Sequence, residues 1–154
     1  MDLDQEVERA TGRPISALFE EEGEDFFRIQ EAAVLRLVGL GAPLVLATGG
    51  GTPCFHDSLD WLLAHGPVVW LDVPPAVIVG RLVRAPAASP PGVVPGNRPL
   101  LAAAAAASPQ ATETMLLALL TQTLSARAPF YARAPHHLRA DNPTVAALRN
   151  ELRL

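Results

Sequence analysis

The sequence predicts an α/β protein with a parallel sheet. Two short apolar runs, residues 44–47 and 68–73, have the unbroken hydrophobicity of strands that are buried on both faces. Segments with the apolar spacing of helices surround these runs, and strands that alternate with helices form a layered fold. With 154 residues, 49% of them hydrophobic, the chain can bury a core, and we expect one domain, residues 1–154.

Three helices are predicted before the first strand. Residues 4–10 form a short helix that stops at Gly12, and residues 16–22 form a second that stops at Gly23. Glycine is common just after the last helical turn, so both ends are well marked. A longer helix is predicted from about 24 to 38, where apolar residues recur at helical spacing.

The central part of the chain alternates strands and helices. The run 44–47 leads into three consecutive glycines, and a helix over 58–65 begins at Asp57 or Ser58 as its cap. The second run, 68–73, precedes a proline pair that opens a helix to about Arg84, because proline is tolerated in a first turn.

The last part begins with an irregular segment. Prolines and glycines crowd residues 85–99, which predicts a loop. Amphipathic spacing then predicts a helix over 112–127, interrupted by Pro129. A last strand is predicted over 138–141, and a terminal helix begins at Pro143.

The composition excludes several classes of protein. All twelve cationic side chains are arginines, and without lysine these residues form neither a Schiff base nor a P-loop ending in Gly-Lys-Ser/Thr. No apolar run has the length of a membrane span, and the single cysteine, Cys54, predicts a reducing, cytoplasmic location. Scattered arginines in a chain of pI near 5.5 argue against a nucleic-acid partner and favour capture of a small anion.

Two motifs combine residues that can carry chemistry. Asp2 and Asp4 can divide their work between the water shell of a metal and a substrate hydroxyl, or they can simply favour the start of a helix. Gly49-Gly50-Gly51 follows a predicted strand, where α/β folds bind ligands and where glycine allows close approach. A loose turn is the other interpretation of the glycines.

Three arginines are further candidates. Arg98 stands at the edge of the proline- and glycine-rich loop, from which an arginine can swing onto a phosphate, or it is a solvated loop residue. Arg28 and Arg127 each lie beside aromatic residues. Taken singly, both fit an ordinary surface or helix-packing role.

Together these motifs resemble those of the shikimate kinase family. The resemblance covers nearly the whole chain, in Asp2-Leu3-Asp4, Thr11-Gly12-Arg13-x-Ile15, Phe19-x-x-x-Gly23-Glu24-x-x-Phe27-Arg28-x-x-Glu31, Ala47-Thr48-Gly49-Gly50-Gly51, Arg98-Pro99-Leu100-Leu101 and Arg127-x-Pro129-Phe130-Tyr131. It implies a P-loop kinase-like, three-layer α/β fold. It also implies transfer of the γ-phosphate of ATP to the 3-hydroxyl of shikimate, with Mg²⁺ as cofactor.

The resemblance also implies a role for each matching residue. Asp4 would bind the 3-hydroxyl and accept its proton, and Arg98 would reach the ATP phosphates from a lid within about 85–112. Asp2 would contact Mg²⁺ through water. The substrate-binding residues would be Asp4, Arg28, Gly50, Gly51 and Arg127, with about 1–40 as the shikimate-binding helical region.

One part of the family pattern does not occur in these residues. The family opens with a strand, a P-loop and a helix before the Asp-x-Asp motif, so the central strand of the sheet is expected to be missing here, and a start codon assigned too far downstream is the expected cause. Two alternatives stay open: a non-catalytic module that binds a shikimate-like acid, and a kinase for another small polyol acid. We expect a monomer that binds shikimate and ATP.

Overall fold

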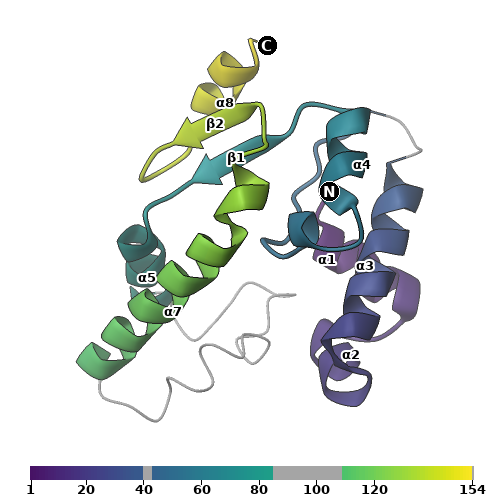
Figure 1. Ribbon diagram of the computed structural model, residues 1–154, viewed down its shortest axis with the longest axis horizontal. Coiled ribbons are helices and arrows are strands. Elements are labelled where there is room, and N and C mark those ends of the chain that lie inside the picture. The colour runs from purple at the N-terminus through teal and green to yellow at the C-terminus, as the bar shows by residue number, and fades with distance from the viewer. Residues whose placement is uncertain (40–42, 85–108, 154) are drawn as a thin grey trace. The chain divides into compact units, whose positions relative to one another are not determined.

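The computed structural model describes residues 1–39, 43–84 and 109–153, in two compact units, Met1–Val68 and Val69–Leu154 (Figure 1). The predicted loop over 85–99, which includes Arg98, lies outside the described residues. Among the described helices, none is both long and apolar enough to cross a membrane.

The first unit is helical. Its elements are α1 (Leu3–Thr11), α2 (Ile15–Glu21), α3 (Gly23–Val38), the 3₁₀ helix η1 (Thr52–Cys54) and α4 (Ser58–His65). Helix α1 begins where it does because the carboxylate of Asp2 accepts hydrogen bonds from the N–H groups of Asp4 and Gln5. It ends at Gly12, whose φ of 68° is the left-handed conformation that favours glycine. The four helices predicted in this part of the chain are confirmed to within a residue or two.

The core of the first unit joins its first three helices. The buried residues of this core are Leu3, Val7, Leu18, Phe27, Val34 and Leu35. Half-buried apolar side chains, including Trp61 from α4, pack against them. Leu3 and Val7 are one turn apart on α1, and Phe27 and Val34 are two turns apart on α3, so each helix turns one apolar stripe inward.

The segment 44–47 differs from its prediction as a buried strand. It is extended, and it joins the start of the chain by one parallel bridge, in which Leu3 N–H donates to the Ala47 carbonyl and Ala47 N–H donates to the Met1 carbonyl, both at 2.9 Å. Val45 is 80% exposed, and only Leu46 packs on the core. Within the described residues of this unit, a single bridge is too short to build a sheet that buries both faces.

The second unit contains the parallel sheet. Strands β1 (Val69–Asp72) and β2 (His136–Arg139) pair in parallel, with Val69 opposite His136. The helices are α5 (Pro75–Arg84), α7 (Pro109–Tyr131) and α8 (Val145–Leu152). Helices α5 and α7 lie side by side, as Figure 1 shows, and they bury Val79 and Leu116 against each other.

Two predictions in the second unit need correction. Helix α7 continues through Pro129 to Tyr131 instead of stopping at residue 127. Proline near a helix end removes only one backbone hydrogen bond, and the chain resumes the pattern at once, with Ala132 N–H donating to the Ala128 carbonyl at 2.9 Å. The last strand begins at His136, two residues earlier than predicted.

Candidate functional site

The three consecutive glycines of the first unit lie between two of the predicted site residues. A Cβ atom added to Gly49 would stand 3.6 Å from Oδ1 of Asp4. One added to Gly51 would stand only 2.7 Å from Cζ of Arg28, closer than real Cβ contacts. The structure therefore brings Asp4, the glycine loop 49–51 and Arg28 together. It also shows that the lack of a side chain at Gly51 leaves the space that the guanidinium of Arg28 occupies.

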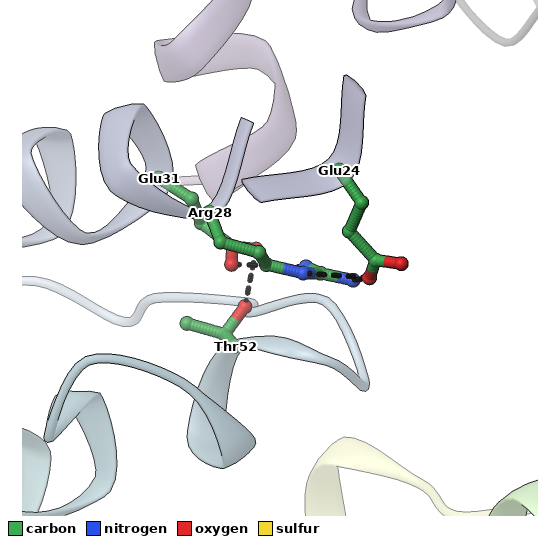
Figure 2. A network of polar contacts seen from close by, with 4 residues as sticks. All are labelled: Glu24, Arg28, Glu31 and Thr52. Carbon is green, nitrogen blue, oxygen red and sulfur yellow. Dashed lines mark hydrogen bonds and ion pairs between the residues drawn. The ribbon is translucent and has the colours of Figure 1, made fainter. Parts of the chain in front are cut away.

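Arg28 is held firmly by its own helix (Figure 2). Its Nε and Nη2 donate to Oε1 of Glu24 at 3.2 and 3.0 Å, and its Nη1 donates to Oε2 of Glu31 at 3.0 Å. The guanidinium also stacks over the ring of Phe55, with Cζ 4.7 Å from the ring centroid. Arg28 is only 8% exposed, so the direction of its guanidinium is set by these neighbours.

Glu31 connects Arg28 to the residue that follows the glycines. Its Oε1 accepts a hydrogen bond from Oγ1 of Thr52 at 2.7 Å, while its Oε2 accepts from Arg28. Glu31 is 2% exposed and Thr52 is completely buried. A buried carboxylate is tolerated only when it is paired and hydrogen-bonded, and here both of its oxygens are.

Asp4 lies in the first turn of α1 in an acidic environment. Partial burial by the surrounding protein raises its pKa above the usual 3.8, and the negative charges of Asp2 and Glu31 raise it further. The positive charge of Arg28 acts in the opposite direction but does not cancel these effects. A carboxylate with a raised pKa is a better proton acceptor than an ordinary aspartate.

Asp2 serves as the cap of α1. Its Oδ1 accepts hydrogen bonds from the N–H groups of Asp4 at 2.9 Å and Gln5 at 3.3 Å. Among the residues that the structure describes, no three acidic, histidine or cysteine side chains gather into a set that could hold a metal ion. The side-chain contacts that the structure shows for Asp2 are those of the cap of α1.

Of the three remaining predicted site residues, the structure describes two. Gly50 is exposed at the centre of the glycine loop. Arg127 is half-buried on α7 and belongs to the second unit. Arg98 falls in the stretch 85–108, which the structure does not describe.

Three residues of the site were missed as functional candidates in the sequence. Glu24 and Glu31 are four and three positions from Arg28, the separations at which side chains meet on one helix face. That spacing was the available signal for both glutamates. Thr52 gave no such signal, because its partner Glu31 is 21 positions away in the sequence.

Comparison with known proteins gives a consistent result. The family model described as shikimate kinase matches residues 1–152. Shikimate kinase of Phocaeicola vulgatus is 36% identical over 141 residues, which cover 92% of this chain and 71% of that protein. Shikimate kinase of Thermus thermophilus is 37% identical over 153 residues, or 99% of this chain and 72% of the relative.

Solved structures show the same relationship. Shikimate kinase from Bacteroides thetaiotaomicron superposes with a TM-score of 0.82 at 31% identity, over all of this chain and 83% of the other. Shikimate kinase from Acinetobacter baumannii in complex with shikimate gives a TM-score of 0.69 at 32% identity, over 99% of this chain and 73% of the other.

The fold is thus that of the P-loop kinase-like α/β proteins, as predicted. The parallel β1–β2 pair is the described part of the sheet that this class requires. The chain belongs to the shikimate kinase family. The function inferred from its motifs is confirmed at the level of that family.

Proposed function

We propose that the chain binds shikimate at the glycine loop and supports transfer of the γ-phosphate of ATP to its 3-hydroxyl. One observation carries this proposal: Arg28 is fixed against Gly51 by two glutamates, while Asp4 stands at Gly49, the other end of the same loop. A cation and a carboxylate at opposite ends of a short loop suit a small acid that also carries hydroxyl groups.

Arg28 is arranged to bind the carboxylate of the substrate. Its hydrogen bonds to Glu24 and Glu31 use three of its five N–H groups. Among the described residues, one N–H on each terminal nitrogen has no further hydrogen-bond partner, and two such groups can hold both oxygens of a carboxylate. Arg127 would supply the second cation of this clamp, and Gly50 and Gly51 would let the substrate ring approach the backbone closely.

Asp4 would act on the hydroxyl group. When the 3-hydroxyl oxygen forms its bond to the γ-phosphorus, the hydroxyl proton passes to the carboxylate of Asp4, and ADP leaves with the electrons of the broken P–O bond. The raised pKa of Asp4 favours this proton acceptance. Phosphoryl transfer depends mainly on positioning and on charge stabilisation. For the substrate that accepts the phosphoryl group, the fixed arginine and the aspartate would supply both.

The phosphate side of the reaction would involve Mg²⁺, Arg98 and Asp2. The metal, when bound, neutralises charge on the transferring phosphoryl group. Asp2 would hold it through water, while its Oδ1 caps α1. Arg98 would contact the phosphates of ATP from the 85–112 lid. We further propose that the protein acts as a monomer.

A second candidate is a module that binds shikimate without phosphorylating it. The 154 residues include no lysine, so they do not supply the ammonium group that a P-loop places on the phosphates of ATP. The acceptor side of the site does not need that group. Binding of shikimate and turnover of ATP must therefore be measured separately.

Calorimetry of the 154-residue chain with shikimate, followed by an ADP-release assay with ATP and Mg²⁺, tests the proposal. We expect heat of binding in the wild-type chain and its loss in Arg28→Met. Arg9→Met is the matched control, because Arg9 is an exposed arginine that pairs only with Glu6 among the described residues. Absence of shikimate binding would refute the proposal. Binding without ADP release would support the second candidate, and ADP release that depends on shikimate would exclude it.

A further inference from the structure

Thr52 occupies an unusual place between the glycine loop and α3. Its backbone N–H donates to the Gly49 carbonyl at 3.2 Å and so closes the turn formed by the glycines. Its hydroxyl donates in the other direction, to Oε1 of Glu31 at 2.7 Å. One residue therefore fixes the loop with its backbone and the carboxylate of Glu31 with its side chain.

The hydroxyl of Thr52 fixes the orientation of Glu31. A carboxylate that is held at only one oxygen can turn about its last torsion, which is broad for glutamate. Here Thr52 holds Oε1 and Arg28 holds Oε2, so the plane of the carboxylate is defined at both oxygens. Figure 2 shows both contacts of the Glu31 carboxylate, one with Thr52 and one with Arg28.

We propose that Thr52 is a positioning residue for Arg28. Without the hydroxyl, Glu31 loses the contact that sets the plane of its carboxylate, and the hydrogen bond from Nη1 of Arg28 to Glu31 loses its fixed direction. The guanidinium is then held by Glu24 alone among its two glutamate partners. Thr52 itself is completely buried, so it acts through Glu31 and makes no contact with substrate. The consequence for shikimate binding rests on the function proposed above, whereas the position of Arg28 does not.

The first test measures Arg28 directly, without any ligand. The variants are Thr52→Val, which keeps the shape but removes the hydroxyl, and Thr52→Ser, which keeps the hydroxyl. Thr11→Val is the matched control, because, within the described residues, the Thr11 hydroxyl bonds only the backbone carbonyls of Val7 and Arg13. In NMR spectra, we expect the Nε–H signal of Arg28 to shift or broaden in Thr52→Val and to keep its wild-type position and width in Thr52→Ser and Thr11→Val.

The second test measures the consequence for the ligand. By calorimetry, Thr52→Val should bind shikimate about tenfold more weakly, as expected when a hydrogen bond to a charged group is lost. The affinity for the methyl ester of shikimate, which lacks the charged carboxylate, should fall much less in the same variant. A purely structural defect would weaken both ligands equally, and Thr52→Ser should restore wild-type binding of shikimate.

The outcomes separate the two proposals. An unchanged Arg28 signal in Thr52→Val overturns the positioning role, whether or not shikimate binds. If the wild-type chain fails to bind shikimate but the Arg28 signal changes as expected, the proposed function fails and the positioning role stands. Should Thr52→Val not fold, Thr52→Cys replaces it, since a thiol is a weaker donor and should give a smaller change in the same signal. A wild-type Arg28 signal in Thr52→Cys would then contradict the inference.

Discussion

Replacing Gly51 with alanine should damage the site through one steric contact. The backbone of Gly51 has φ −82° and ψ −31°, which alanine adopts without strain, so the new methyl group is the whole perturbation. That methyl would stand 2.7 Å from both Cζ and Nη1 of Arg28. The guanidinium cannot simply swing away, because Glu24 and Glu31 hold it by three hydrogen bonds.

The cost of this contact can be estimated in two ways. Overpacking of a well-packed site costs about 1–3 kcal/mol of folding free energy. If Arg28 moves instead, at least one hydrogen bond to a charged group is lost, which is worth about 1.5–3 kcal/mol. Expressed as affinity for shikimate, that loss is about tenfold to a hundredfold.

Thermal unfolding and calorimetry of Gly51→Ala measure these two costs. Gly66→Ala is the control, because a Cβ there meets no atom of the described residues within 4 Å and the backbone is extended. We expect Gly51→Ala to lose shikimate affinity and Gly66→Ala to retain it. If Gly51→Ala binds shikimate as tightly as Gly66→Ala does, Arg28 does not bind the substrate from the position described.

Two further predictions concern the acidic start of α1. Because the pKa of Asp4 is raised in the folded protein, its ionisation costs stability, and that cost is absent at pH well below 3.8. The unfolding temperature of Asp4→Asn relative to the wild type should therefore rise as the pH increases above 3.8, and a pH-independent difference would contradict the assignment. Asp2→Ala should lose about 1 kcal/mol of stability with the cap of α1, whereas Asp2→Asn should lose much less. If chemical denaturation shows equal losses of stability in Asp2→Ala and Asp2→Asn, the cap is not the contribution of Asp2 to stability.

Local sequence patterns predicted the helices well, and residues near one another in the sequence explain why. Gly12 ends α1 and Gly23 is the first residue of α3, and each is a signal that a few residues carry by themselves. The prediction of a buried strand over 44–47 was wrong, because an apolar run does not show how much of it finds a partner strand. Whether Val45 is buried or exposed depends on strand pairing, which only the folded chain defines.

The candidate site divides in the same way. Asp4, Arg28 and the glycines could be named from motifs, and the structure brings them together in the first unit. The contact between Thr52 and Glu31 could not be predicted, since it joins residues from separate elements through two buried side chains. Local spacing predicts neighbours along a helix, but it does not predict which side chain will meet them from a distant loop.

The fixed position of Arg28 also has an entropic consequence. An arginine on an open surface samples many rotamers, and a ligand that binds it must overcome the loss of up to about 2 kcal/mol of side-chain entropy. Arg28 gives up that freedom when the first unit folds, because two glutamates and the ring of Phe55 already hold it. When an anion binds, Arg28 therefore loses little further side-chain entropy. More of the electrostatic attraction then remains as binding free energy.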